Sequence, residues 1–129
     1  MGKLIIIIDD SPTIRKIFEV TLHRAGYEVM CFSSAEYAIT WLKSAEARIP
    51  DLVFVDLLLP KMNGYSAIRF LREHQAFRHI PFVIISRCHG ALDKLKGRLV
   101  GAVDYLEKPI ETATILSAVH RYLDAAGTA

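Results

Sequence analysis

Short apolar runs of strand length alternate with segments of helical periodicity along this chain. Residues 4–8 include four consecutive isoleucines, and residues 52–55 and 81–85 are also almost entirely apolar. Strands that are apolar at every position need burial on both faces, as in a parallel sheet covered by helices on both sides. Alternation of such strands with helices predicts βαβ units, and this pattern constrains the fold more than any other feature of the sequence.

The helix signals fall between the apolar runs. Ser11 suits an N-cap and Pro12 the first helical position, while Gly26 suits the end of that helix. The expected strands are 4–8, 27–32, 52–55, 81–85 and 103–106. The expected helices begin after Ser11, after Ser33-Ser34 and at Tyr65, and cover 91–100, interrupted by Gly97, and 111–125. We predict an α/β fold, a doubly wound (βα)5 arrangement with one five-stranded parallel sheet.

Length and charge limit the class of protein. At 129 residues the chain is expected to form one domain, 1–129, with a core over about 3–125 and no second domain. A net charge of +2, without a stripe of Lys and Arg, argues against nucleic acid, and no apolar segment is long enough to cross a membrane. We expect a cytoplasmic protein whose Cys31 and Cys88 are buried, reduced thiols.

Polar side chains gather where the expected strands end. Ligands of open parallel sheets bind at the carboxyl ends of the strands, so these side chains should share one edge. The first strand runs into Asp9 and Asp10, the third into Asp56, the fourth into Ser86 and the fifth into Lys108. Singly, each has a simpler explanation: Asp10 could cap a helix, Ser86 could form a turn and Lys108 could be solvated. These separate explanations do not account for the occurrence of all these polar residues at the ends of strands in one sheet.

Three neighbouring carboxylates repel one another, so either one carboxyl is protonated through a raised pKa or a cation neutralises them. An incomplete set of oxygen ligands suits Mg²⁺, which retains several waters. A metal beside a carboxylate, a hydroxyl and an amine suggests phosphoryl transfer to an aspartate. Lys108 would then neutralise the transferring group and Ser86 would donate a hydrogen bond to it.

The motifs IIDDS, VDLLLPKMNGY and YLEKP, with Ser86 between the last two, resemble those of a two-component response-regulator receiver domain of the single-domain chemotaxis type. The resemblance covers the whole chain and implies the flavodoxin-like receiver fold with no effector domain. The segment SRCHGALDKLKGRLVGAVDYLEKP is similar to stand-alone receivers of type IV pilus twitching-motility systems.

The resemblance also implies a role for each matching residue. Asp56 would accept a phosphoryl group from a histidine kinase or phosphotransfer protein, and Lys108 would contact it. Asp10, Asp56 and the backbone carbonyl of Leu58 would bind Mg²⁺, with Asp9 acting through water. Ser86 and Tyr105 would form the switch that reshapes a partner-binding face made by the fourth helix, fifth strand and fifth helix. The Lys108-Pro109 bond would be cis, and the chain would be no enzyme beyond its own phosphoryl transfer and slow self-dephosphorylation.

The sequence departs from the family at one position. The residue after the switch Ser is usually small, whereas here it is Arg87, which would either contact the phosphoryl group or point to solvent. Leu58 and Cys88 would flank the path of a hydrolytic water and orient it poorly, which predicts slow self-dephosphorylation.

Three other functions are weaker interpretations. A haloacid-dehalogenase-type hydrolase places its acids at alternate positions, and here Asp9 and Asp10 are adjacent. A flavin binder needs a phosphate loop rich in Ser, Thr and Gly, which DDSPTIR lacks. A phosphorylation-independent interaction module remains the alternative.

Overall fold

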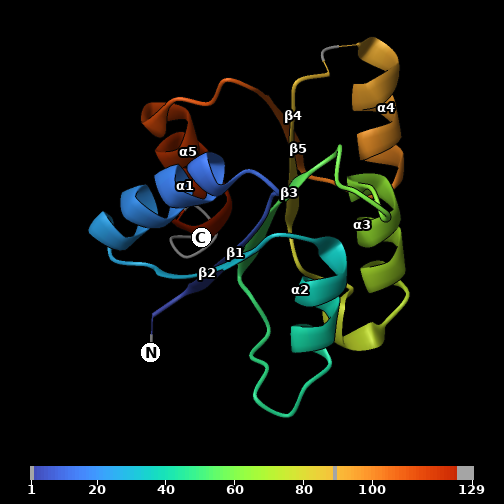
Figure 1. Cartoon of the computed structure of the whole chain (residues 1–129), viewed down its shortest axis with the longest axis horizontal. Helices are drawn as coiled ribbons and strands as arrows, with labels where there is room; N and C mark the ends of the chain where they lie inside the picture. The colour runs from blue at the N-terminus through green and yellow to red at the C-terminus, as the bar shows by residue number, and fades with distance from the viewer. Residues whose placement is uncertain (1, 89, 125–129) are drawn as a thin grey trace.

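One parallel sheet forms the centre of the molecule, and the computed structural model describes residues 2–88 and 90–124 (Figure 1). The sheet has five strands in the order β2-β1-β3-β4-β5, with every neighbouring pair parallel. The strands are β1 (Leu4–Ile8), β2 (Glu28–Phe32), β3 (Leu52–Asp56), β4 (Phe82–Ser86) and β5 (Asp104–Glu107). The predicted doubly wound α/β fold is confirmed.

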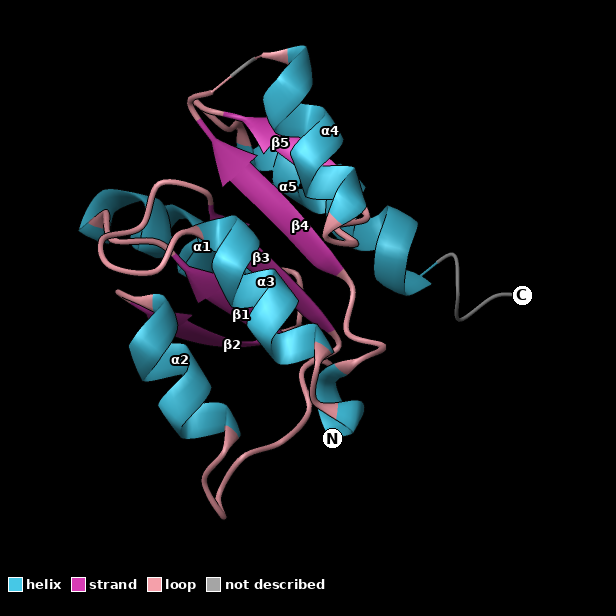
Figure 2. Ribbon diagram, turned by 90° about the vertical axis from the view of Figure 1, so that its right-hand side faces the viewer, coloured by secondary structure: helices cyan, strands magenta, loops and turns pink. Residues whose placement is uncertain are grey.

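Helices cover both faces of the sheet. Figure 1 shows α1 and α5 on one face and α2, α3 and α4 on the other, and in Figure 2 the second group lies in front of the sheet. The helices are α1 (Pro12–Arg24), α2 (Ala35–Leu42), α3 (Gly64–Arg72), α4 (Ala91–Leu99) and α5 (Thr112–Val119), with a 3-10 turn at Gln75–Phe77 and a π-helical turn at His120–Asp124.

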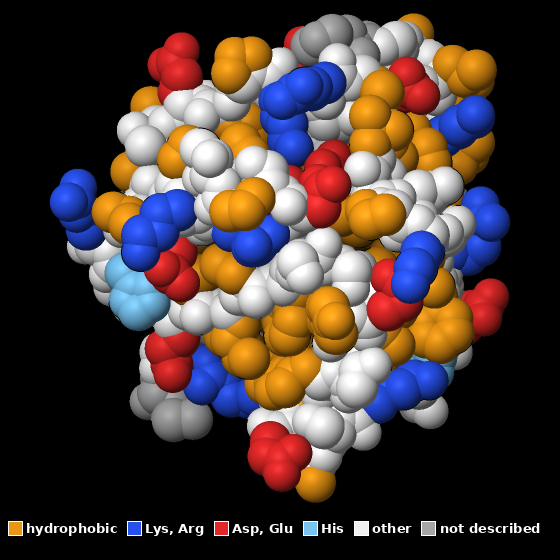
Figure 3. Space-filling model, viewed as in Figure 1, with side chains coloured by type: hydrophobic (Ala, Val, Ile, Leu, Met, Phe, Trp, Pro, Cys, Tyr) orange, Lys and Arg blue, Asp and Glu red, His pale blue; other side chains and the backbone are white. Residues whose placement is uncertain are grey.

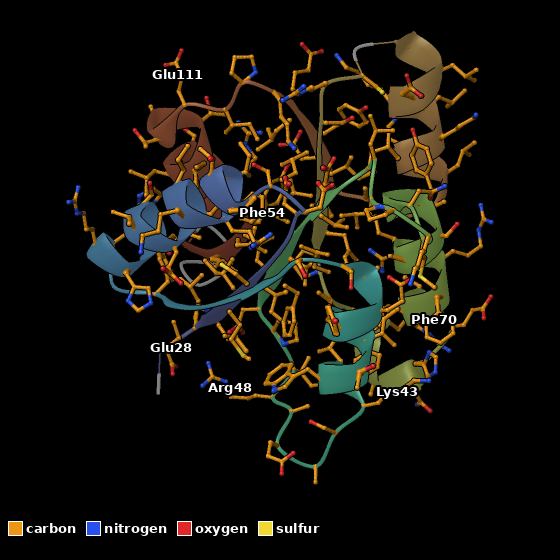
Figure 4. The ribbon with its side chains drawn as sticks, in the orientation of Figure 1. Glu28, Lys43, Arg48, Phe54, Phe70 and Glu111 are labelled. Atoms are coloured by element: carbon orange, nitrogen blue, oxygen red, sulfur yellow. The ribbon has the colours of Figure 1, made fainter. Side chains whose placement is uncertain are left out.

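The isoleucine run of β1 is explained by its central place in the sheet. Ile5 and Ile7 pack in the core beneath α1 and α5, whereas Ile6 and Ile8 pack in the core on the opposite face. Phe54 of β3 lies near the middle of the molecule (Figure 4), with its ring centroid 4.9 Å from that of Phe18 in α1. Because alternate side chains enter different cores, every position of these inner strands must be apolar.

Surface contacts join the outer elements. Arg48 pairs with Glu28 at 3.0 Å, and the ammonium of Lys43, after α2, lies 4.8 Å from the ring centroid of Phe70 in α3 (Figure 4). No helix in the described part of the chain combines the length and apolar character needed to span a membrane.

Several expected details were wrong. Gly97 does not interrupt α4 but lies buried within it, where a Cβ atom would approach Cδ1 of Ile84 to 3.0 Å. The last helix widens at His120 into a π-helical turn, whose hydrogen bonds span five residues instead of four, and its expected end at Ala125 lies outside the described residues. Cys31 and Cys88 are free, as expected, but only half-buried, because one lies on an edge strand and the other in a loop.

Candidate functional site

Three carboxylates meet at the ends of β1 and β3. Oxygens of Asp9, Asp10 and Asp56 all lie within 4.8 Å of one another. Asp9 is fully buried and Asp56 is 5% exposed, whereas Asp10 faces solvent. Figure 3 shows acidic side chains near the middle of the molecular face that is turned to the viewer, with Lys or Arg side chains beside them. The sequence-predicted acids are therefore brought together at one sheet edge.

The turn after β1 explains why adjacent acids differ in burial. Oδ1 of Asp9 accepts a hydrogen bond from the backbone N–H of Ser11 at 2.9 Å, which holds Asp9 beneath the start of α1. Ser11 is the N-cap of α1, and its hydroxyl oxygen accepts from the N–H of Ile14. Asp10 is therefore not the cap, and its side chain is left on the surface of the acidic cluster.

Lys108 lies between the two buried acids. Its Nζ is 2.8 Å from Oδ2 of Asp9 and 3.1 Å from Oδ2 of Asp56, and its side chain is only 10% exposed. Burial disfavours the ammonium, but contact with the two carboxylates outweighs burial and raises the pKa of Lys108. Burial also raises the pKa of Asp9, with Lys108 and the Ser11 N–H opposing that shift. The cation thus stays charged and compensates only part of the acidic cluster.

The cluster retains capacity for a further cation. Oδ2 of Asp9 faces Lys108 as an ion pair but makes no aligned hydrogen bond within the described residues. Three carboxylates against one ammonium leave two negative charges, and an oxygen-only donor set suits Mg²⁺. The residues present therefore fit this ion.

Asp56 is fixed by donors on both of its oxygens. Oδ1 accepts from the N–H of Leu58 at 3.1 Å, and Oδ2 faces Lys108. Sequence reasoning missed the contribution of Gly64, at which a Cβ atom would lie 2.7 Å from the carbonyl oxygen of Asp56. The Asn63-Gly64 pair was the available signal, since the Asn63 side chain caps α3 and Gly64 allows the helix to approach the strand end.

The acids open into a cleft of about 270 Å³, which is lined by Asp10, Ser11, Asp56, Leu58, Arg87 and Lys108. Leu58, one of these lining residues, is 57% exposed. Arg87 is also exposed, and it has no ion pair or hydrogen bond among the residues that the structure describes. It is therefore the uncommitted cation of the cleft, because Lys108 already contacts two acids.

Ser86 and Tyr105 are joined through Cys88 rather than placed on the cleft wall. The buried Ser86 hydroxyl accepts from the N–H of Cys88 at 3.1 Å, and the Tyr105 hydroxyl donates to the Cys88 carbonyl at 2.9 Å. Burial raises the pKa of Tyr105, which keeps the phenol protonated as a donor. The backbone of Cys88 is a second feature that sequence reasoning missed.

The Lys108-Pro109 peptide bond is cis, as expected. The backbone N–H of Lys108 donates to the Ser86 carbonyl at 2.7 Å, so the ends of β4 and β5 are tied directly together.

Known proteins are similar to this chain in sequence and in fold. Residues 5–120 match the response regulator receiver domain. The chain belongs to the response regulator receiver family. It is 33% identical to Protein PilG of Pseudomonas aeruginosa over 122 residues (95% of this chain and 88% of that protein). It is also 33% identical to Protein PilH of the same organism over 119 residues (92% and 96%). The structure of the chemotaxis protein CheY4 of Vibrio cholerae superposes with a TM-score of 0.87 at 27% identity, covering 95% of this chain and all of that one.

This receiver domain is thus a signalling module of two-component systems, related to single-domain chemotaxis and pilus-type receivers rather than to classical enzymes. Receiver domains bind Mg²⁺ at an acidic pocket, and this chain has a cluster of three aspartates, two of them buried, at the ends of β1 and β3. They interact with histidine kinases or phosphotransfer proteins and with downstream targets.

Proposed function

We propose that this receiver accepts a phosphoryl group on Asp56 from a histidine kinase or phosphotransfer protein in the cytoplasm and signals by phosphorylation-dependent binding of another protein. The observation that carries the proposal is the position of Lys108, within 3.1 Å of the carboxylate of Asp56 and 2.8 Å from that of Asp9. A buried ammonium at this place can neutralise a transferring phosphoryl group beside a carboxylate nucleophile.

Mg²⁺ would be held by Asp10, Asp56 and the backbone carbonyl of Leu58. Asp9 would act through water, since its oxygens already face the Ser11 N–H and Lys108. When bound, the ion supplies positive charge that neutralises acids and phosphoryl oxygens together.

The chemistry of the chain's own residues is a nucleophilic displacement. A carboxylate oxygen of Asp56 attacks the phosphorus atom, the new O–P bond forms, and the P–N bond to the donor histidine breaks. The imidazole nitrogen leaves with the electron pair of that bond and takes up a proton. Lys108 would pair with the phosphoryl oxygens, and the Ser86 hydroxyl would donate to one of them on turning toward the cleft.

Ser86 and Tyr105 would carry the change to a partner. Because both now bond to the backbone of Cys88, a Ser86 hydroxyl that turns to the phosphoryl group gives up the Cys88 N–H. The loop that carries the acceptor of Tyr105 is thereby released. The surface of α4, β5 and α5 would change in consequence and bind the downstream protein.

Arg87 would contact the phosphoryl group, because it lines the cleft with no ion-pair partner among the described residues. Guanidinium groups bind phosphate oxygens through charge-assisted hydrogen bonds. Together with Leu58 and Cys88, neither of which orients water well, this contact would slow self-dephosphorylation.

The decisive experiment is intact mass spectrometry after incubation with acetyl phosphate and Mg²⁺. We expect the mass of one phosphate on the wild type and none on Asp56→Asn, with Asp93→Asn as a control that removes an acid outside the cleft. Undiminished phosphate in Asp56→Asn would refute the assignment. A wild type that takes up no phosphate yet binds its partner would favour the phosphorylation-independent interaction module.

A further inference from the structure

Helix α4 exposes leucines along its outer surface. Leu92, Leu95 and Leu99 are 62%, 43% and 76% exposed, and Gly97 is the buried residue of the helix. Positions i, i+3 and i+7 share one face of a helix, so the three leucines form a continuous apolar crest. Three solvated leucines on a nine-residue helix indicate an interaction surface rather than a core-facing element.

A groove runs beside this crest, between α4 and α3. Its volume is about 330 Å³, and it is lined by Asn63, Tyr65, Ser66, Arg69, Lys96, Leu99 and Val100. The Tyr65 hydroxyl donates to the Asp93 carbonyl at 2.7 Å and thereby links the two helices. The groove is consequently held open by a bond within the domain and needs no ligand to form.

The rim of the groove is positively charged. Arg69 on α3 and Lys96 on α4 are both exposed, and neither has an ion-pair partner in the described ranges 2–88 and 90–124. Arg98 adds a further exposed cation on the other side of the crest. Figure 3 shows hydrophobic side chains exposed where Figure 1 places α4, with Lys and Arg side chains among them.

The positive charge around the groove indicates which kind of partner can bind there. A second copy docked crest to crest would bring Lys96 and Arg98 of each copy against like charges, which opposes association. A helix with leucine-sized side chains on one face and Asp or Glu beside them would bury the crest and pair with Arg69 and Lys96. We propose that the α3–α4 groove and the α4 crest bind an acidic amphipathic helix of a partner protein.

The α3–α4 groove lies on the flank of α4 opposite to the α4-β5-α5 face of the proposed function. That face includes a different cleft, of about 310 Å³, lined by Lys94, Gly97, Arg98, Ala102, Val103, Asp104 and Tyr105. On that side Lys94 is already paired with Glu107 at 2.8 Å. The two flanks of α4 can therefore be tested independently, and binding in the groove does not require a phosphorylated Asp56.

The test uses two synthetic helical peptides with identical leucine spacing, one with Glu at its flanking positions and one with Lys. Binding to the unphosphorylated full chain is measured by titration of the ¹⁵N-labelled protein. We expect shifts confined to α3 and α4 and an affinity for the Glu peptide at least about tenfold higher than for the Lys peptide. Leu99→Ser should weaken binding about tenfold, whereas Ile49→Ser, a change at another exposed apolar residue, should leave it unchanged.

Charge reversal provides a second readout, because an unfolded variant would bind neither peptide. Arg69→Glu with Lys96→Glu should reverse the preference in favour of the Lys peptide. Equal affinities for the two peptides, shifts centred on Asp104 and Tyr105, or a dimer that Leu99→Ser dissociates would each overturn the proposal. None of these outcomes bears on phosphorylation of Asp56, which the mass measurement tests separately.

Discussion

Replacing Asp10 by Asn is expected to stabilise the metal-free protein and to destabilise it relative to the wild type once Mg²⁺ is present. Asp10 is the exposed member of the acidic cluster, and Lys108 contacts the other two acids instead. Its charge is therefore the least compensated of the three. Removing that charge relieves repulsion but also removes a ligand proposed for the ion.

The magnitude follows from the geometry. Two unit charges 4.8 Å apart, the outer limit of the cluster, repel by about 3.5 kcal/mol at an effective dielectric constant of about 20 and by about 0.9 kcal/mol in water. Exposure of Asp10 places its repulsion near the lower value, at about 1–2 kcal/mol. A negative charge just before α1 also stabilises that helix terminus by about 0.5 kcal/mol, which the variant loses. The net gain is about 1 kcal/mol, or about 4 °C in the melting temperature of a chain this size.

With Mg²⁺ bound, the wild type should be more stable than Asp10→Asn, which is the reverse of the order without metal. At a concentration 100 times its dissociation constant, a ligand specific for the native state adds about 2.7 kcal/mol to the stability of the wild type. With about hundredfold weaker affinity, the variant gains only about 0.4 kcal/mol under the same conditions. The difference of about 2.3 kcal/mol exceeds the 1 kcal/mol advantage that the variant has without metal.

Urea denaturation of both proteins, with EDTA and with saturating Mg²⁺, measures the two free energies of unfolding. Glu111→Gln is the matched control: it removes one negative charge at an exposed residue before α5 (labelled in Figure 4) that is not part of the cluster, and it should leave the Mg²⁺ response unchanged. Equal stability of wild type and Asp10→Asn in EDTA would refute the repulsion argument. An unchanged Mg²⁺ response in the variant would refute the role of Asp10 as a ligand.

Three further outcomes are expected. The Leu58→Asn, Cys88→Glu double variant should lose phosphate at least about tenfold faster than the wild type, followed by mass spectrometry, because polar groups there can orient water; decay of the wild type within seconds, or no acceleration, would contradict this. Arg72 donates to the carbonyls of Arg78, Ile80 and Gly101, so Arg72→Met should lower the free energy of unfolding by about 3 kcal/mol in urea denaturation, whereas the exposed Arg69→Met on the same helix should change it little. Burial raises the pKa of Cys31 to about 11, so only about 1% of this thiol is thiolate at pH 9. Iodoacetamide should therefore alkylate Cys31 far more slowly in the native protein than in the protein unfolded in urea. Equal rates would show that the fold does not shield the thiol.

The inner strands and the acidic edge were predictable from the sequence because burial on both faces leaves a direct signature in it. β1, β3 and β4 are buried at every position, and their apolar runs end at the residues that form the site. The edge strands carried a weaker signal. β5 has the sequence DYLE and is only partly buried, so no continuous apolar run marks its ends. The apolar Val103 was expected to begin this strand, but the strand begins one residue later, and Val103 is 44% exposed.

Features that depend on a contact between distant segments were not predictable. The sequence identifies Gly97 as a poor helix former, but only the approach of α4 to Ile84 explains why glycine is required in that helix. The side chain of Arg72 likewise reads as a solvated charge on α3, whereas it joins three loop carbonyls at one end of the sheet and lies 5.3 Å from the ring centroid of Phe82. Local patterns specify which face of an element is buried, and the partner on that face is decided by the packed structure.

The contacts around Asp56 also show how a modification there would reach α4. Both oxygens of Asp56 already face a donor, so a phosphoryl group on either one displaces the N–H of Leu58 or the ammonium of Lys108. The backbone N–H of Lys108 donates a hydrogen bond to the Ser86 carbonyl, and the Ser86 hydroxyl accepts one from the N–H of Cys88. The carbonyl of Cys88 in turn accepts a hydrogen bond from the Tyr105 hydroxyl.

The ring of Tyr105 in turn lies beside Gly97, where a Cβ atom would be 3.5 Å from Cδ2 of the ring. Since Gly97 is the buried residue of α4, a shift of Tyr105 would press directly on this helix, which is also held by the Tyr65–Asp93 hydrogen bond and the Lys94–Glu107 ion pair. Because α4 exposes three leucines and packs a glycine against Tyr105, we expect phosphorylation of Asp56 to act on the surface of the domain through this helix.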